Sequence, residues 1–309
     1  MNSTSNVQRP NRLAALHRFA ISITIFIILG HLVLGFEQSW AQHLVGITTA
    51  YGVELSLEQI DAWIQQRPSR FAGGWDNLVN FLLPAHIVGL AVPTMLYVNE
   101  RLWPVAFAVA VAMASKAIFR APFGQGSRHF FNGTNLGLVS ALLILPGVGL
   151  VHPSSFTSGV SGIWDWMVPA AIVVAGTLLN AQLTGKMPLI AAWVGGFVLQ
   201  AGLRSVLFDT SFITALLPMT GVLFLIITFY MVTDPGTSPK KPIDQVIFGG
   251  SIAAVYGILM ANHVVYAMFY ALAIVCGLRG LVFYGQAWVA YFKQSQFWGK
   301  TSETPSLSA

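Results

Sequence analysis

Charged residues are scarce in this sequence. Asp, Glu, Lys and Arg make up only 9% of its 309 residues, and hydrophobic residues make up 55%. Soluble domains usually carry roughly a quarter charged residues, so this composition excludes an ordinary soluble protein. Apolar runs long enough to cross a bilayer as helices recur along the whole chain. The sequence therefore predicts an all-α membrane protein.

Cysteine is almost absent. The only one, Cys276, lies inside an apolar run, which excludes an internal disulfide and a thiolate metal site. The seven histidines are scattered without metal-ligand spacing. The chain also lacks a serine–histidine–aspartate set, a phosphate-binding loop of the G-x-x-x-x-G-K type and paired catalytic carboxylates. We expect no metal site and no stand-alone catalysis.

Acidic residues are fewer than basic ones, which gives a net charge of +5. The basic residues sit between apolar segments, where orientation in the bilayer explains them. They do not form a basic patch interleaved with exposed aromatic residues. We therefore expect membrane lipid and not nucleic acid as a partner.

Nine apolar segments are about twenty residues long, as membrane-spanning helices require. The first is longer than a signal-peptide core of about 7 to 15 residues, so it is interpreted as a retained span. A further segment, 41–57, is short and carries Glu54, and we expect it to be a broken or half-length helix. The nine clear segments are 15–36, 77–98, 103–119, 131–151, 163–181, 187–206, 212–232, 244–261 and 263–281.

The positions of Lys and Arg decide whether 41–57 crosses, because short cytoplasmic loops retain these residues. If it crosses, only Arg101 and Arg204 lie outside. This predicts about ten transmembrane helices with both termini cytoplasmic, in the inner (plasma) membrane. The predicted regions are an N-terminal tail at 1–14, a membrane domain at 15–281 and a C-terminal tail at 282–309.

Two polar stretches fall on the predicted cytoplasmic side. "TDPGTSP", 233–239, holds more turn-forming residues than a turn requires. "FRAPFGQGSRHFFNGTN", 119–135, combines glycines, arginines, paired phenylalanines and asparagines. We expect the Asp234 carboxylate to tie its loop by accepting backbone amides. Ser238 is predicted to cap the ninth helix, and the asparagines are predicted to enter the first turns of the fifth.

These two stretches resemble motifs of the membrane subunit family that includes RnfD and NqrB. "RHFFNGTN" resembles the segment that carries an F-N-P motif in that family, and "MVTDPGTSP" resembles its T-D-P-x-T-S-P. The resemblance implies a ten-helix fold similar to urea and ammonium transporters, with a five-plus-five inverted repeat. It also implies electron transfer through a bound flavin within a larger redox complex.

The chain departs from this family in an outer loop. Family members often carry FMN on a threonine in a Ser-Gly-Ala-Thr motif, but here Ser161 and Gly162 are followed by Ile163 and Trp164. Covalent FMN is therefore not expected. Gly133 also replaces the usual proline. The sequence as a whole resembles the divergent UnbU-type branch of the family, which is associated with enediyne biosynthesis.

The resemblance implies a noncovalent riboflavin or FMN site formed by both motifs. From the residues alone, the loop could instead be a capped turn, and the asparagines could simply join helices. Lys116 could contact a flavin or serve as a snorkelling anchor. The predicted cofactor-binding residues are Lys116, Arg128, Phe130, Phe131, Asn132, Thr134, Asn135, Thr233, Asp234, Thr237 and Ser238.

Three functions remain open at this stage. The first is a flavin-binding electron-transfer subunit that works with other redox subunits or a biosynthetic complex, with a quinone among its candidate partners. The second is a transporter or channel on the same scaffold, since a fold does not fix a function. The third is a membrane anchor for a natural-product biosynthetic assembly. The mid-span residue His86 is expected to be a histidine satisfied by neighbouring helices.

Overall fold

The structure is a computed structural model that describes residues 12–123 and 126–301. Most of the 1–14 tail and the last residues of the 282–309 tail therefore lie outside the described residues. Helices dominate, and the two small sheets each pair two short strands. The longer helices are α1 (Arg12–Leu29), α2 (Trp40–Ile64), α3 (Trp75–Met95), α4 (Trp103–Ile118), α5 (Gly133–Ile144), α6 (Met167–Leu178), α7 (Met187–Leu207), α10 (Pro242–Ala261) and α11 (Ala267–Thr301).

Short helices and strands complete the chain. They are the π-helices η1 (Gly30–Leu34), η4 (Leu179–Thr184) and η6 (Ile227–Met231), the 3₁₀-helices η2 (Pro153–Phe156), η3 (Gly162–Trp166) and η5 (Leu217–Thr220), the α-helices α8 (Phe212–Leu216) and α9 (Val222–Ile226), and the strands β1 (Leu96–Tyr97), β2 (Arg120–Phe123), β3 (Gly126–His129) and β4 (Gly149–Leu150).

The helices identify an all-α membrane protein. Among the described residues, six helical stretches are long and apolar enough to cross a bilayer, and a seventh is bent by 70° between η5 and α9. The three other expected spans correspond to α2 and to the shorter apolar helices α4 and α5. Every expected apolar segment is thus helical, although the count of ten crossings stays a prediction.

The expectation that 41–57 forms a broken or half-length helix is wrong. α2 is one continuous α-helix of 25 residues, and the Ser39 side chain caps its start by accepting from the Gln42 amide. Its polar side chains are turned inward: Gln42 and His43 are buried. Gly46 meets the backbone of Gly89 in α3, so the two helices approach closely. Average hydropathy hides such a helix because its polar residues contact protein.

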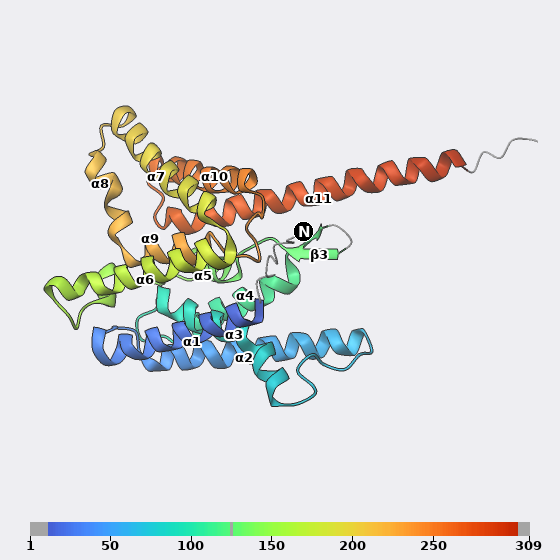
Figure 1. Cartoon of the computed structure of the whole chain (residues 1–309), viewed down its shortest axis with the longest axis horizontal. Helices are drawn as coiled ribbons and strands as arrows, with labels where there is room; N and C mark the ends of the chain where they lie inside the picture. The colour runs from blue at the N-terminus through green and yellow to red at the C-terminus, as the bar shows by residue number, and fades with distance from the viewer. Residues whose placement is uncertain (1–11, 124–125, 302–309) are drawn as a thin grey trace, which may run out of the picture.

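α2 runs along the bundle against α3 and α4 and connects its two ends (Figure 1). The connection from α2 to α3 lies at the same end as the β2–β3 hairpin. This is the grouping that the charge argument predicted for residues 67–70 and 116–128. We call it the motif end, because both polar stretches lie there, and the opposite end the far end.

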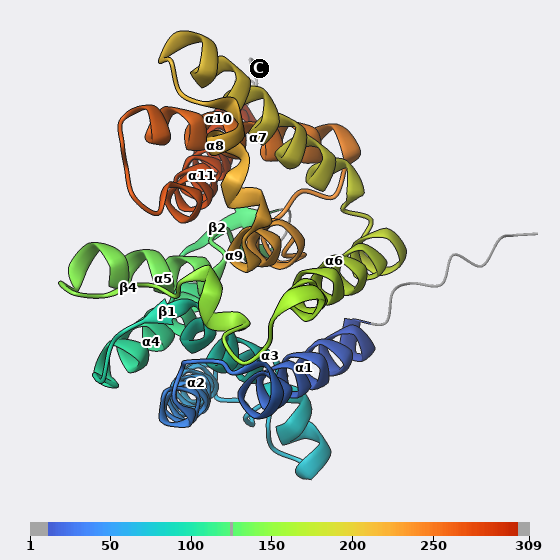
Figure 2. The same ribbon diagram turned by 90° about the vertical axis from the view of Figure 1, so that its left-hand side faces the viewer.

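The two halves of the chain share features in the same order. α1 and α6 each end in a π-helix followed by a left-handed glycine, Gly35 (φ 74°) and Gly185 (φ 63°). α1 contacts α3 as α6 contacts α9, α2 contacts α4 as α7 contacts α10, and α4 contacts α5 as α10 contacts α11. In the end-on view, α1 to α4 lie below and α7, α10 and α11 above (Figure 2). The five-plus-five repeat stays a prediction, which this parallel supports.

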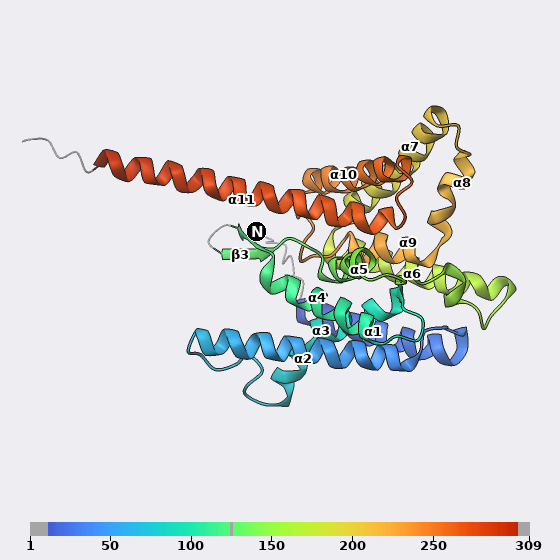
Figure 3. The same cartoon turned by 180° about the vertical axis from the view of Figure 1, so that it is seen from behind.

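α11 is the longest helix and extends well beyond the bundle at the motif end (Figure 3). It has 35 residues, which corresponds to a length of about 52 Å at 1.5 Å per residue. The expected span ended at residue 281, but the helix continues to Thr301. At least part of the predicted C-terminal tail is therefore a direct extension of the last transmembrane helix.

His86 in α3 is hydrogen-bonded to both neighbouring helices, as expected. Its Nε2 lies 2.8 Å from Thr24 Oγ1 of α1, and its Nδ1 lies 2.8 Å from the Tyr51 hydroxyl of α2. A buried polar side chain in a bilayer needs such partners, because no water replaces them. The contacts assign His86 a role in joining three helices.

Glu58, near the end of α2, is a buried carboxylate held by two arginines of the following loop. Its side chain is 1% exposed, and it accepts from Arg67 at 2.7 Å and from Arg70 Nε at 2.6 Å. We expect Glu58→Gln to lower the free energy of unfolding by about 1 to 2 kcal/mol, since charge-assisted bonds are lost while the shape is kept. Denaturation in detergent measures this, with the exposed Glu100→Gln as control. Equal stabilities of the two variants would contradict the prediction.

Candidate functional site

The two polar stretches contact each other directly at the motif end. The first stretch begins after α4, forms the β2–β3 hairpin and then enters α5. The second follows the π-helix η6 and precedes α10. Arg128 of β3 joins them by donating to the Gly236 carbonyl, and Asn132 at the start of α5 donates to Met231, the last residue of η6. The predicted neighbourhood of the two motifs is therefore present, although residues 99 or more positions apart in sequence form it.

Asp234 organises the inside of the second stretch. Its Oδ1 accepts from the Gly236 amide at 3.0 Å, and its Oδ2 accepts from the Thr237 hydroxyl at 3.0 Å. Its backbone oxygen accepts from the Ser238 amide at 2.9 Å. The expectation that the Asp234 carboxylate ties its loop is confirmed, through one backbone amide and one hydroxyl. This carboxylate is engaged with its own loop.

The expectation that Ser238 caps the ninth helix is wrong. The α10 helix starts at Pro242, and Lys241 occupies its N-cap position. The Ser238 hydroxyl instead donates back to the Asp234 carbonyl at 2.7 Å. Ser238 is completely buried. Its hydroxyl bonds to carbonyls of its own turn, because α10 starts too far along the chain for this side chain to cap it.

The backbone carbonyls of the second stretch point outward and accept from three cations. Arg128 donates to Pro235 at 2.7 Å, to Gly236 at 2.6 Å and to Ser238 at 3.4 Å. Arg279 of α11 donates to the Thr237 carbonyl, and Lys186, just before α7, donates to the Pro239 carbonyl. The five consecutive carbonyls of 235–239 thus connect the hairpin, α7 and α11. We call these three side chains the carbonyl-binding cations.

Asn132 and Asn135 lie in the first turn of α5, as expected. The Asn132 side chain caps the helix by accepting from the Asn135 amide at 2.9 Å, and its Nδ2 donates to Met231 at 3.2 Å. Asn135 Nδ2 donates to Phe269 of α11 at 3.0 Å. Asn135 is 1% exposed, and its Oδ1 has no hydrogen-bond partner among the described residues. An unpaired buried carbonyl is costly, so this atom is a candidate contact for a ligand.

The paired phenylalanines pack against α11. The rings of Phe130 and Phe131 lie 4.8 Å apart, and both contact Phe119. Phe130 fills the space above Gly280, where a Cβ would collide with its ring, and Phe131 lies over Gly277. Phe130 is buried while Phe131 is partly exposed. Only Phe131 therefore retains surface that could form the wall of a ligand site.

The remaining predicted residues differ in their surroundings. Thr233 is buried and donates to the Phe229 carbonyl at 2.5 Å, so its hydroxyl belongs to the turn after η6. Thr134 is partly buried at the start of α5. Lys116 is partly buried at the end of α4, where Asp234 and Glu54 act on its charge. Lys116 ends α4 and Asn135 lies in the first turn of α5, and these two helices contact each other.

His129 of β3 completes the polar surroundings of the second stretch. A Cβ on Gly236 would lie 2.8 Å from His129 Nε2, so the imidazole lies directly against this glycine. Burial lowers the pKa of His129, the Asp234 charge opposes this, and the charges of Lys116, Arg120 and Arg128 add to the lowering. A histidine with a lowered pKa is neutral at neutral pH and can donate or accept a hydrogen bond.

Ser161 and Gly162 lie elsewhere, in the loop that leads into η3. Both are exposed, and Gly162 has a φ of 68°. The neighbouring residue Gly159 donates to the Leu34 carbonyl at 2.9 Å, so this loop packs on the end of η1 at the far end of the bundle. The structure places no described residue of the two motifs beside it.

Two residues of the site were not predicted from the sequence. Lys186 and Arg279 were assigned only to the inner side, as orientation charges, yet both bind the second stretch. Lys186 is buried, and the Arg279 guanidinium lies over Phe248 and Phe283. Only their positions in the sequence could have indicated this role. Each of the two basic residues flanks or interrupts an apolar run, on the side of the membrane predicted for the motifs.

Burial lowers the pKa of Lys186 to about 8, and the positive charge of Arg128 adds to the effect. Between about pH 8 and the ordinary lysine value, the unfolded chain binds a proton that the folded chain does not, so stability rises with pH. We expect wild type to gain about 1 kcal/mol per pH unit there relative to Lys186→Met. Denaturation midpoints at pH 7.5 to 9.5 measure this, with exposed Lys240→Met as control. If the denaturation midpoint of Lys186→Met changed with pH in parallel with that of wild type, the prediction would be contradicted.

Comparison with known proteins does not assign the chain to a family. No protein-family model matches the chain, and no curated protein matches it significantly. Among the described residues, no group of three or more His, Cys, Asp or Glu side chains could hold a metal ion. The functional interpretation therefore depends on the two motifs and on the contacts between them.

Proposed function

We propose that this protein is a flavin-binding electron-transfer subunit of the membrane, of the RnfD and NqrB type. Two observations carry the proposal: the two resembling motifs contact each other directly, and the first of them holds a buried acceptor without a partner among the described residues, Asn135 Oδ1. A bound flavin supplies one- and two-electron transfer, and the protein supplies binding, orientation and electrostatics.

The donor and acceptor set fits the pyrimidine edge of a flavin, which presents an imide N–H and carbonyl oxygens. Asn135 Oδ1 would accept from the N–H. Lys116, at the end of the contacting helix α4, would donate to a carbonyl oxygen, and His129 adds a second polar group near the loop. The partly exposed ring of Phe131 would cover part of the apolar face.

The internal bonds of the second stretch limit its role. Thr233, Asp234, Thr237 and Ser238 are engaged with their own loop, so we assign them to holding the site in shape. Arg128 holds the loop against the hairpin in the same way. The predicted binding set therefore separates into contact groups, led by Asn135 and Lys116, and supporting groups.

The electrostatics of the site favour an electron-rich ligand. Lys116 and the carbonyl-binding cations surround one carboxylate, Asp234, and basic groups outnumber it locally. Nearby positive charge stabilises negative charge on a ligand and therefore raises its affinity for electrons. We assign the motif end to the cytoplasmic side, where electron donors and other redox subunits would reach it. Electrons would leave to a partner subunit or a quinone.

Flavin analysis of the purified protein tests the proposal. We expect a yellow chromophore that acid or heat releases, identified by mass spectrometry as riboflavin or FMN, at close to one per chain. No covalently bound flavin is expected, because the outer loop lacks the threonine motif. A colourless, folded preparation that takes up no added flavin would overturn the proposal. Solute flux into liposomes in that case would support the transporter, and stable capture of a biosynthetic enzyme would support the anchor.

A further inference from the structure

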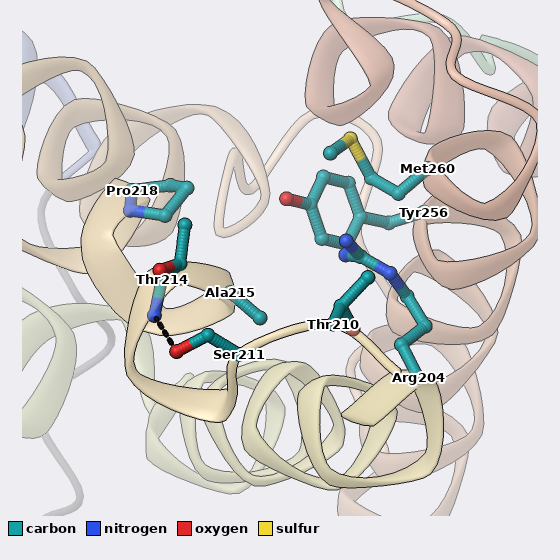
Figure 4. A pocket seen from close by; sticks show the side chains of 8 residues that line it. All are labelled: Arg204, Thr210, Ser211, Thr214, Ala215, Pro218, Tyr256 and Met260. Atoms are coloured by element: carbon teal, nitrogen blue, oxygen red, sulfur yellow. Dashed lines mark hydrogen bonds between the residues drawn. The ribbon is translucent and has the colours of Figure 1, made fainter. Parts of the chain in front are cut away.

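A cavity of about 290 Å³ (Figure 4) lies beside α8, at the end of the bundle opposite the β2–β3 hairpin (Figure 1). It is bounded by the last turns of α7 and α10 and by the α8–η5 segment that precedes the 70° bend. Arg204 on its wall follows Lys186 by eighteen residues along α7, which places it about 27 Å from the motif end. The residues that line the cavity are Arg204, Thr210, Ser211, Thr214, Ala215, Pro218, Tyr256 and Met260.

The charge in this cavity is positive and is not neutralised by protein. Arg204 donates at 3.4 Å to Gln200 Oε1 of the preceding turn, and its side chain is also hydrogen-bonded to the Tyr256 hydroxyl. All ion pairs among the described residues involve Arg67 or Arg70, so Arg204 has no carboxylate partner within the described chain. A partly buried guanidinium without an anion is an expensive arrangement, and a bound anion would remove that cost.

Hydroxyl groups accompany the guanidinium. Tyr256 is 2% exposed, and its phenol oxygen points into the space, with the guanidinium of Arg204 beside the ring (Figure 4). Thr210 lies in the turn after α7, which Asp209 forms with a φ of 53°. The buried Thr210 Oγ1 has no hydrogen-bond partner among the described residues. A cation with several hydroxyl donors is the chemistry that binds phosphate oxygens.

The surroundings of the cavity are apolar and suit an amphiphile. Pro218, Ala215 and Met260 line the cavity itself. Outside it, Phe208, Phe212, Ile213 and Leu217 are all at least 40% exposed, as expected for side chains that face lipid. A free inorganic ion would leave these apolar walls in contact with water. A phospholipid would place its phosphate at Arg204 and its acyl chains along α7 and α8.

We propose that this cavity binds the phosphate head group of an anionic phospholipid, with Arg204 as the charge partner and Tyr256 and Thr210 as hydroxyl donors. The site is separate from the flavin site and does not depend on it. It would fix the bent α8–α9 segment against α7 and α10. Lipid without net charge would occupy it less well, because its own cationic group competes with Arg204.

Native mass spectrometry of the full chain tests the proposal, after reconstitution into vesicles of phosphatidylglycerol and phosphatidylcholine at equal amounts. We expect wild type to retain phosphatidylglycerol preferentially, and Arg204→Gln to reduce that retention by about tenfold, the effect of losing one charge-assisted contact. Arg101→Gln is the matched control, because Arg101 lies at the same end and does not line the cavity. Tyr256→Phe keeps the ring packing and is expected to lower retention several-fold.

The outcomes separate the sources of the phosphate. Equal retention of the two lipids by wild type, or equal retention by Arg204→Gln and Arg101→Gln, would overturn the proposal. Competition by millimolar inorganic phosphate or glycerol phosphate, without any lipid preference, would also overturn it and indicate a soluble anion. If Arg204→Gln does not fold, full retention by a folded Tyr256→Phe combined with Thr210→Val would count against the site.

Discussion

Asn135→Ala is expected to reduce the flavin content of the purified protein by about tenfold or more, since one buried hydrogen bond is worth that much in affinity. The reason is that Asn135 Oδ1 is a buried acceptor of the first motif that has no partner among the described residues. The substitution removes the group that we propose accepts from the flavin imide, and it opens a small space there. The measurement is the ratio of extracted flavin to protein in the monodisperse fraction.

The control for this experiment is Asn262→Ala. Asn262 is exposed at the end of α10, and its side chain also donates to a backbone carbonyl, that of Ile258 at 2.8 Å. Asn135→Ala also loses the bond to Phe269, so the melting temperature is recorded in parallel. A folded Asn135→Ala protein that keeps its flavin would show that Asn135 joins helices and holds no ligand.

Arg128→Ala is expected to lower the free energy of unfolding by about 2 to 4 kcal/mol, because hydrogen bonds from charged groups contribute about 1.5 to 3 kcal/mol each and are not additive. One guanidinium holds the hairpin to three carbonyls of the second stretch. Hydrogen exchange should show faster exchange across 233–239. Arg128→Lys keeps the charge but not the planar fork and should recover only part of the loss.

Arg120→Ala provides the comparison within the same hairpin. Arg120 is exposed and donates to Ser127 Oγ and to the Ser127 carbonyl, each at 3.0 Å, so its side-chain bonds stay inside the hairpin and the adjoining helix end. We expect a loss under about 1 kcal/mol, as for most exposed charges. If Arg120→Ala and Arg128→Ala destabilise the protein equally, the bridge between the two motifs is not what stabilises the site.

Much of the fold could be predicted from the sequence, because bilayer thickness imposes the length of apolar runs. Each expected segment forms a helix, and the internal bonding of Asp234 follows from local chemistry. The length of α2 could not be predicted in this way. Gln42, His43 and Glu58 lower its average hydropathy, yet all three are buried by contacts with other parts of the chain. Average hydropathy measures how well a helix suits lipid. It does not account for polar side chains that are buried against other parts of the protein.

The site was only partly predictable for a related reason. The sequence indicated that 119–135 and 233–239 share one side, and the structure brings them into contact. It did not indicate that Arg279 and Lys186 donate to the loop, because a basic residue at a helix end looks the same whether it faces lipid head groups or a backbone carbonyl. Ser238 was predicted to cap α10, but that helix starts three residues too late for Ser238 to be its N-cap, and the hydroxyl bonds within its own turn.

The carbonyls of 235–239 also set an order for the assembly of the protein. Arg128 and Lys186 are synthesised before this loop, but Arg279 and the Phe269 carbonyl that accepts from Asn135 belong to α11, the last helix. The loop therefore stays incomplete until the final span is inserted. A cofactor at this place would be loaded after synthesis of the whole chain, and a chain that stops before α11 would retain nine of the expected segments without a finished site.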